Sequence, residues 1–241
     1  MGFVNVYEDA ERAKAYAALE FPGTYYLAYR DLPQIIRAHV KGSKALDFGC
    51  GAGRSTRFVK SLGFDAVGID ISEDMLTLAR ERDPQGDYRL AGVGGLRELG
   101  PAAYDLVISV FTFDNIPLLE TKVALFRGLK DLLGPEGRII SLVSAPEIYT
   151  HDWASFKTSC FPGNKTARRG DSVYTIMNDV VDRRPVHDIL WPDEAYRETY
   201  ELAGLEVVEV YRPLGRTEDS CEYVNEMTVA PWVIYVLCKA N

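Results

Sequence analysis

The sequence predicts a doubly wound α/β fold, in which a mostly parallel seven-stranded sheet ends in an antiparallel strand and carries a cap insertion. Three observations lead to this prediction. Short apolar runs alternate with amphipathic segments between residues 44 and 144. One run, residues 104–111, is continuously apolar after Asp105, as expected for a strand covered on both faces. Residues 145–191 then interrupt the alternation with an irregular stretch rich in aromatic and charged side chains.

The individual elements follow from apolar periodicity and from helix start and stop signals. Strands are expected at 44–49, 65–71, 87–91, 104–111, 137–144, 206–213 and 230–239. Helices are expected at 9–19, 31–40, 54–63, 72–82, 119–133 and 191–204. Asp31 and Ser72 are predicted N-caps, and glycines at 63, 134 and 204 mark helix ends. The last two strands pair most simply as a hairpin with a long connection.

The chain is expected to form one domain. Its 241 residues, 47% of them hydrophobic, suffice for one full core. Within a single domain over 1–241, we interpret residues 1–43 as an N-terminal helical lid and residues 145–191 as a substrate cap.

The overall charge argues against two classes of partner. The formal net charge is -8, and an acidic surface repels phosphate backbones and anionic lipids, so neither nucleic acid nor a membrane is expected. No apolar run approaches the roughly 18 residues of a membrane span. The first residues also lack a secretory signal. The four cysteines form no CxxC pair, which favours reduced thiols, no metal site and a cytoplasmic location.

A glycine-rich turn follows the first strand of the sheet, in the stretch LDFGCGAGRST (46–56). A dinucleotide site requires GxGxxG, but Arg54 stands where the third glycine should be. The turn therefore lacks a complete pyrophosphate clamp, and a smaller anion such as a carboxylate fits the following helix N-terminus better.

Two carboxylates indicate which other chemical groups this ligand carries. Asp70 ends the second strand about twenty residues after the turn, where an acidic side chain accepts hydrogen bonds from a ribose diol. Asp47 adds negative charge where an amino group or a sulfonium can bind. A ribose, a carboxylate and a cationic centre occur together in S-adenosylmethionine (SAM).

Four segments resemble the motifs of class I SAM-dependent methyltransferases, in the right order and spacing. They are LDFGCGAG (46–53), GIDISEDML (68–76), YDLVISVF (104–111) and LLGPEGRIISLVS (132–144). The resemblance implies a Rossmann-like fold of the small-molecule branch, with Asp70 on the ribose and Met75 beside the adenine. One position departs from the family, because Val93 stands where an acidic residue usually holds the adenine amino group.

On this resemblance we assign a cofactor site for SAM. Its predicted residues are Tyr25, Arg30, Asp47, Gly49, Cys50, Gly51, Gly53, Asp70, Ile71, Met75, Val93, Gly94 and Ser109. Arg30 is expected to pair with the methionine carboxylate, although a surface ion pair explains it equally well.

The acceptor is expected to be a small metabolite held in line with the methyl group, and the protein is expected to be a monomer or a homodimer. Predicted catalytic residues are His151, His187 and Tyr174, and predicted substrate contacts are Phe113, Asn115, Trp153 and Arg168. Solvated histidines and core aromatic rings remain the competing interpretation of these side chains.

The predicted reaction is transfer of the sulfonium methyl to an O, N or S atom of that metabolite. Two alternatives remain open from the sequence. One is another use of SAM, either intramolecular cyclisation as in azetidine-2-carboxylate synthases or aminobutyl transfer. The other is a SAM-binding regulator without catalysis.

Overall fold

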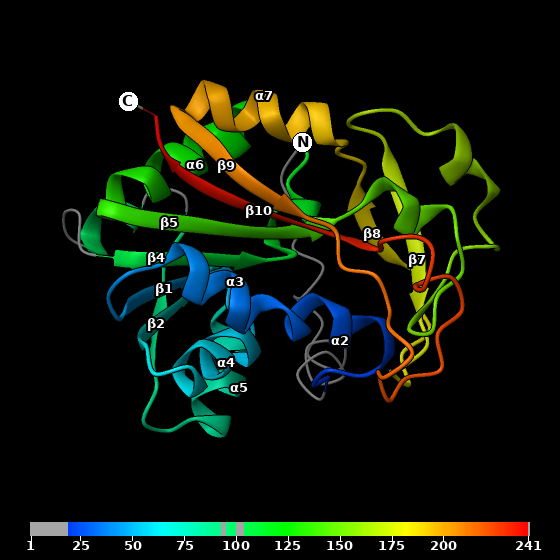
Figure 1. Cartoon of the computed structure of the whole chain (residues 1–241), viewed down its shortest axis with the longest axis horizontal. Helices are drawn as coiled ribbons and strands as arrows, with labels where there is room; N and C mark the ends of the chain where they lie inside the picture. Colours follow the sequence, from blue (N-terminus) through cyan, green and yellow to red (C-terminus); the bar gives the residue numbers. More distant parts are fainter. Residues whose placement is uncertain (1–18, 93–94, 100–103, 241) are drawn as a thin grey trace.

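The sheet of the computed structural model, which describes residues 19–92, 95–99 and 104–240, has the strand order β3-β2-β1-β4-β5-β10-β9 (Figure 1). Its strands are β1 (Lys44–Phe48), β2 (Asp65–Asp70), β3 (Asp87–Leu90), β4 (Tyr104–Val110), β5 (Leu133–Ser144), β9 (Leu205–Tyr211) and β10 (Trp232–Lys239). Strands β1 to β5 are mutually parallel, and β10 runs antiparallel to both β5 and β9. The predicted seven-stranded sheet with an antiparallel last strand is confirmed.

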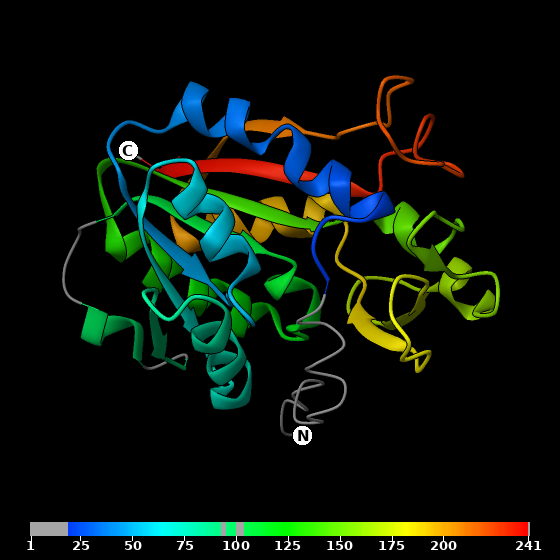
Figure 2. The same cartoon turned by 90° about the horizontal axis from the view of Figure 1, so that it is seen from below.

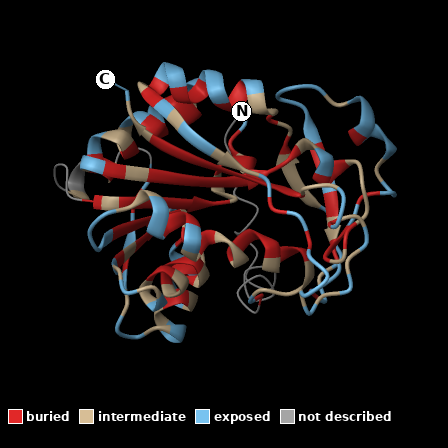
Figure 3. Ribbon diagram, in the orientation of Figure 1, coloured by how far each residue is buried: buried red, intermediate tan, exposed pale blue. Residues whose placement is uncertain are grey.

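Helices cover both faces of the sheet (Figures 1 and 2). They are α2 (Gly23–Arg30), α3 (Leu32–His39), α4 (Arg54–Ser61), α5 (Glu73–Arg82), α6 (Leu119–Leu132) and α7 (Asp193–Ala203). Apolar side chains of α6 and α7 pack on one face, and those of α2, α3 and α4 pack on the other. Figure 3 shows the consequence, since the central strands are buried along most of their length.

Helix boundaries agree with the sequence signals at three caps, although the side chain at one of them makes no cap bond. The Ser72 hydroxyl accepts a hydrogen bond from Met75 N (3.4 Å), and Gly204 ends α7 with a φ of 74°. Asp31 makes no cap bond, because the unpredicted helix α2 runs up to it and its carboxylate pairs with Arg30 (2.8 Å) and Arg216 (3.3 Å). The helix predicted over 9–19 falls almost entirely outside the described residues.

Strand β5 begins four residues before its predicted start at residue 137. Leu133 pairs with Tyr104, and the next paired position on β5 is Arg138, opposite Leu106. The residues between, which include Gly134 and Pro135, bulge out of the ladder, where proline's missing N–H costs no hydrogen bond. The turn signal was correct, but it marks an irregularity inside the strand.

The cap, residues 145–191, follows β5 directly and therefore lies beyond the carboxyl ends of the parallel strands (Figure 1). It contains a small antiparallel sheet in the order β6-β7-β8. Its elements are η3 (Pro146–Tyr149), β6 (Phe156–Lys157), η4 (Pro162–Thr166), β7 (Ser172–Met177) and β8 (Val186–Ile189). These strands are too short to show a clear alternation in the sequence. Among the described helices, none is long and apolar enough to cross a membrane.

Candidate functional site

The glycine-rich loop, residues 49–53, joins β1 to α4, and its own backbone bonds hold its shape. Gly49 N and Cys50 N both donate to Ile69 O (2.8 and 2.9 Å), and Gly51 N donates to Asp70 Oδ2 (2.8 Å). These three N–H groups are therefore engaged by the protein. They precede the N-terminus of α4 at Arg54, where the sequence predicts the carboxylate, so that expectation stays a prediction.

The first two glycines of the loop serve different purposes. Gly49 has a φ of 75°, and a Cβ there would lie 2.2 Å from Thr112 Oγ1, whose hydroxyl donates to Phe48 O (3.0 Å). Gly51 has a φ of 52°, and of the described atoms a Cβ there would approach only Met75 Cε, at 3.1 Å. Gly49 is thus required by packing within the protein, whereas at Gly51 an added Cβ would meet only the end of the flexible Met75 side chain among the described atoms.

Asp70 and its neighbours form a polar edge next to an apolar surface. The Asp70 carboxylate accepts Ser72 N at Oδ1 (2.9 Å) in addition to Gly51 N at Oδ2, and burial raises its pKa. The adjacent Ile71 is 50% exposed, which is unusual for an isoleucine. Met75 packs just behind the loop with Ala52. A ribose at the carboxylate with a purine on Ile71 and Met75 fits this arrangement.

Asp47 carries an orphaned oxygen. Its carboxylate is fully buried, and Oδ2 accepts both Ser55 Oγ and Thr56 Oγ1 at 2.6 Å. Oδ1 has no hydrogen-bond partner among the described residues. Burial raises the pKa of Asp47 to about 6. A buried unpaired carboxylate oxygen is uncommon, and a ligand N–H or cation would satisfy it.

Arg54 brings a cation to the loop that the sequence analysis did not assign. It is the first residue of α4, and its guanidinium lies 5.0 Å from the Tyr25 ring centroid and 5.4 Å from that of Tyr29. It also donates to Glu20 O (2.8 Å). The signal was present in the sequence, since Arg54 is the residue that breaks the dinucleotide pattern.

Arg30 occupies a different place from the one predicted. Its guanidinium donates to Asp31, to Asp219 Oδ2 (2.6 Å) and to Leu214 O (2.9 Å). These partners lie at the end of α2 and in the β9–β10 connection, so Arg30 is held in an ion-pair cluster of its own. The prediction that it meets the methionine carboxylate is not supported.

Four rings form an aromatic cluster between α2, β4, β6 and β10. They are Tyr25, Phe111, Phe156 and Trp232, with centroid separations from 4.6 Å (Phe111–Trp232) to 5.9 Å. Phe111 directly follows β4 with a φ of 63°, the one left-handed non-glycine residue among those described. Such strain persists where packing enforces it and is common at functional sites.

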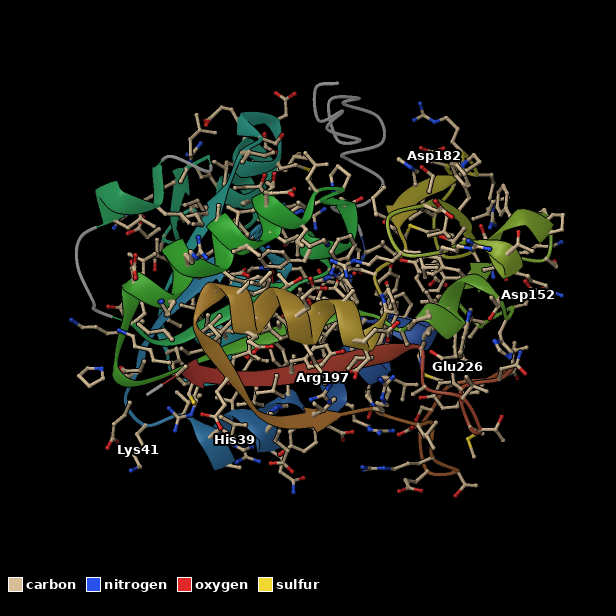
Figure 4. The ribbon with its side chains drawn as sticks, turned by 90° about the horizontal axis from the view of Figure 1, so that it is seen from above. His39, Lys41, Asp152, Asp182, Arg197 and Glu226 are labelled. Atoms are coloured by element: carbon tan, nitrogen blue, oxygen red, sulfur yellow. The ribbon has the colours of Figure 1, made fainter. Side chains whose placement is uncertain are left out.

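A buried carboxylate ties the cap to α2. Glu226 lies in the β9–β10 connection near Asp152 of the cap (Figure 4). Its Oε1 accepts Thr24 Oγ1 (2.6 Å) and Ala154 N (2.8 Å). Thr24 and Ser155 also exchange two hydrogen bonds, of 2.9 and 3.0 Å. These contacts fix the start of α2, and with it Tyr25, against the cap.

A second polar group, here called the seam cluster, lies where the cap meets the sheet. It consists of Asp114, Asn115, Lys122, Tyr149 and Asp188. Asp114 accepts Ser144 N (3.0 Å) and Tyr196 Oη (3.1 Å), and burial raises its pKa. Lys122 is fully buried, donates to Phe113 O, and lies 4.7 Å from the Trp191 ring centroid. Burial lowers the pKa of Lys122 to about 7.

Several predicted residues are inside the protein. Phe113 is fully buried and stacks on Phe126 with a centroid separation of 3.9 Å, so it belongs to the core. Trp153 is 2% exposed and donates to Ile148 O (2.9 Å). Ser109 and Cys50 are also buried, and burial raises the pKa of Cys50 well above its usual value. The predicted substrate contacts of Phe113 and Trp153 are not supported, because neither ring offers a free face.

The predicted catalytic side chains lie on the cap. Tyr174 and His187 pair across β7 and β8 and stack at 5.3 Å. Tyr174 lines a hollow of about 560 Å³ formed with the η4 segment. His151 Nδ1 lies 3.1 Å from Glu147 O. Arg168 is exposed and donates only its backbone N–H to Asp171 (2.8 Å) among the bonds described. The structure brings Tyr174 and His187 together, but not beside the glycine-rich loop.

Asn115 ends η2 (Thr112–Asn115), the turn that follows β4. Val93 and Gly94 fall outside the described residues, so the replacement for the missing acidic adenine contact is not described. The residues that the structure gathers at the carboxyl ends of β1, β2 and β4 are therefore Asp47, Asp70, Ile71, Met75, the glycine-rich loop and the unpredicted Arg54.

Comparisons of sequence place a known domain over this site. A family model described as a methyltransferase domain matches residues 46–139. The ubiquinone biosynthesis O-methyltransferase of Methylococcus capsulatus is 36% identical over 90 residues, 35% of this chain and 38% of that protein. The 18S rRNA (guanine-N(7))-methyltransferase of Mus musculus is 41% identical over 68 residues, 28% of this chain and 24% of that protein. The chain thus aligns with less than half the length of these curated relatives.

Comparisons of structure extend the likeness to the whole fold. The CcbJ methyltransferase from Streptomyces caelestis superposes with a TM-score of 0.64 and 17% identity, over 92% of this chain and 100% of that one. A SAM-dependent methyltransferase from Clostridium acetobutylicum gives a TM-score of 0.63 and 11% identity, over 98% and 97% of the two chains. At these identities the similarity concerns the fold.

Proposed function

We propose that this chain, of which residues 46–139 match a methyltransferase-domain model, binds SAM and transfers its methyl group to a small molecule. The single observation that carries the proposal is the fit of the site to the cofactor. Bare main chain at Gly51, the Asp70 carboxylate and the orphaned Asp47 Oδ1 lie on one edge of the sheet. No dinucleotide motif explains that combination.

Each part of the cofactor has a partner in this site. Asp70 would hold the ribose diol, Ile71 and Met75 the adenine, and Asp47 the amino group of the methionine moiety. Arg54 would hold its carboxylate in place of Arg30. When bound, SAM would supply a sulfonium methyl group to a well-aligned nucleophile, with S-adenosylhomocysteine as the leaving group.

The protein would position the acceptor and exclude water from the reacting groups. Tyr25, Phe156 and Trp232 are at most 7% exposed and close the region beside the Arg54 guanidinium. The Glu226 contacts with Thr24 and Ala154 hold α2 in a fixed position against the cap. Holding a nucleophile in a site from which water is excluded supplies much of the acceleration for a reactive donor.

A small acceptor is supported by the charge of the chain and by one of the two curated relatives described above. The net charge of -8 opposes binding to phosphate backbones. The O-methyltransferase named for ubiquinone biosynthesis is consistent with a small, oxygen-bearing acceptor.

The product identifies the reaction. Incubating the protein with methyl-labelled SAM and the small-molecule fraction of a cell extract should transfer label to a new compound and release S-adenosylhomocysteine, both detected by mass spectrometry. Release of methylthioadenosine from SAM alone would instead indicate cyclisation or aminobutyl transfer. Absence of any turnover alongside measurable SAM binding would indicate a regulator.

Replacing Asp70 by alanine is expected to weaken SAM binding by about 1–3 kcal/mol, because charge-assisted bonds to the ribose are lost. Isothermal titration calorimetry measures the affinity. Asp70→Asn serves as the matched control, since it keeps the shape and one acceptor for Gly51 N or Ser72 N. Unchanged affinity in the alanine variant would place the ribose elsewhere.

Arg54 and Arg30 provide a direct test of which arginine holds the carboxylate. Arg54→Gln is expected to weaken SAM binding by roughly 10- to 100-fold, the equivalent of one charged hydrogen bond. Arg30→Gln should change it less than about twofold, because Arg30 is engaged by Asp31 and Asp219. The reverse result would restore the role that the sequence predicted for Arg30.

A further inference from the structure

The fully buried carboxylate of Glu226 accepts hydrogen bonds from four donors. Oε1 accepts Thr24 Oγ1 (2.6 Å) and Ala154 N (2.8 Å), and Oε2 accepts Val224 N (2.7 Å) and Asn225 N (3.0 Å). The donors are thus one hydroxyl and three backbone N–H groups. Burial of a carboxylate is costly unless hydrogen bonds replace the lost hydration, so each of these bonds contributes to keeping Glu226 inside the protein.

The four donors come from three segments that are far apart in the sequence. Thr24 belongs to α2, Ala154 to the cap, and Val224 and Asn225 to the β9–β10 connection. Figure 4 shows Glu226 where that connection lies beside the cap. Loss of any one bond would leave a buried charge short of a donor, which is expensive, so the three segments are held together at this one carboxylate.

Helix α2 depends on these contacts for its position. It has only eight residues, and its N-cap, Pro22, makes no side-chain cap bond. Helices this short are unstable in isolation. Neighbouring elements supply the missing partners, since Thr24 N donates to Ser155 Oγ (2.9 Å) and Trp232 Nε1 donates to Thr24 O (2.9 Å). Thr24 is therefore the residue through which the surroundings fix the start of the helix.

Two aromatic rings of α2 relate this anchoring to Arg54. Tyr25 directly follows Thr24, and Tyr29 lies one turn further along the helix. Their ring centroids lie 5.0 and 5.4 Å from the central carbon of the Arg54 guanidinium, within the range of cation–π contacts. Glu20 O, just before α2, accepts an Arg54 N–H (2.8 Å). The orientation of the guanidinium therefore depends on where α2 lies.

We propose that Glu226 is a positioning residue for SAM. It holds Thr24, and with it the two tyrosine rings of α2, so that Arg54 presents its guanidinium to the carboxylate of the cofactor. This inference rests on the proposed function and on the role given there to Arg54. Glu226 acts through α2 and not by contact with SAM. Its effect is confined to the methionine end of the cofactor, because the ribose and adenine are assigned to the end of β2 and to α5.

The first test breaks the anchor at its α2 end. Thr24→Val replaces the hydroxyl by a methyl group of similar size and leaves the other three bonds of Glu226 in place. SAM affinity, measured by calorimetry, is expected to fall by about tenfold, as for coupled residues of one network. Thr24→Ser keeps the hydroxyl and should bind SAM within about threefold of wild type.

Glu226→Gln breaks the anchor at its centre. One carboxylate oxygen becomes an N–H donor that faces other donors, so this variant should weaken SAM binding at least as much as Thr24→Val. The Thr24 variants keep the inference testable if Glu226→Gln does not fold. Wild-type SAM affinity in Thr24→Val would contradict the proposed positioning.

A double-mutant cycle shows whether the anchor acts through Arg54. With Arg54→Gln already present, adding Thr24→Val should change SAM affinity by less than about twofold, because the guanidinium to be positioned is absent. Independent losses that simply add would overturn the inference, since Thr24 would then affect binding by another route.

Methylthioadenosine provides a second readout. It keeps the adenine and ribose of SAM and lacks the amino acid carboxylate, so it needs no correctly placed Arg54. Thr24→Val should bind methylthioadenosine within about twofold of wild type while it loses affinity for SAM. An equal loss for both compounds would mean that the substitution disturbs the whole site, and the inference would be wrong.

Thr199→Val is the matched control for stability. Thr199 is also a fully buried threonine, whose hydroxyl donates to Ala195 O (2.7 Å) and accepts Trp191 Nε1 (3.2 Å). It lies on α7, which packs on the opposite face of the sheet from α2. Thr199→Val should lower the unfolding temperature as Thr24→Val does, and should leave SAM affinity within about twofold of wild type.

Two outcomes of this comparison have different meanings. Similar losses of SAM affinity in Thr24→Val and Thr199→Val would show that stability alone governs binding, which contradicts a positioning role for Glu226. Failure of the proposed function is distinct, because the wild-type protein would then bind no SAM at all.

Discussion

Replacing Lys122 by methionine is expected to remove a pH dependence of stability worth about 1.4 kcal/mol per pH unit above pH 7. Burial lowers the pKa of Lys122 from 10.5 to about 7 in the folded protein. Between these values the unfolded chain binds one proton more than the folded chain, so wild-type stability rises with pH. The contribution is complete above pH 10.5 and is lost as the pH falls through 7.

Denaturant unfolding of both proteins at several pH values measures this effect. From pH 7.5 to 9.5 the free energy of unfolding of the wild type should rise by about 2.5 kcal/mol more than that of Lys122→Met. Asp114→Asn is the matched second variant, because the Asp114 carboxylate helps to keep the proton on Lys122. Its rise should begin at a lower pH. Parallel pH profiles for all three proteins would mean that Lys122 is solvated.

Most of the fold could be predicted because local signals agree with the tertiary arrangement. The strands at the centre of the sheet are continuous apolar runs, and Ser72 and Gly204 start or stop helices by local chemistry alone. Tertiary contacts decide the details that local signals missed. Helix α3 starts after Asp31 as predicted, but the Asp31 side chain pairs with two arginines instead of capping it. Strand β5 begins before the Gly134-Pro135 turn, because Leu133 pairs with Tyr104.

The residues of the site show the same distinction between local sequence signals and tertiary contacts. Asp47 and Gly51 belong to one motif and Asp70 to the next motif along the chain, so their grouping could be predicted. Arg54 was visible only as a departure from another motif. Glu226 comes from the β9–β10 connection, far along the chain from α2, and no spacing in the sequence relates the two. Its hydrogen bonds to Thr24 and Ala154 hold the start of α2 against the cap.

Replacing Asp47 by asparagine is expected to stabilise the protein without cofactor and to weaken its binding of SAM. Desolvation raises the pKa of Asp47 from 3.8 to about 6, despite the hydrogen bonds from Ser55 and Thr56. The folded state therefore favours the protonated form, and this contribution is complete below pH 3.8 and lost as the pH rises through about 6. At pH 8 the ionised carboxylate costs about 3 kcal/mol, which a neutral amide avoids.

The two measurements are expected to move in opposite directions. Unfolding in denaturant should show that Asp47→Asn stabilises the protein at pH 8, with about half that gain at pH 5. Calorimetry should show weaker SAM binding, because an amide N–H in place of Oδ1 meets the cofactor amino group donor to donor. Ser55→Ala is the control, since it removes one bond to Oδ2 and leaves Oδ1 unchanged. If Asp47→Asn lowers stability at pH 8 and leaves affinity for SAM intact, the carboxylate is a structural element, and its unpaired oxygen is not reserved for a ligand.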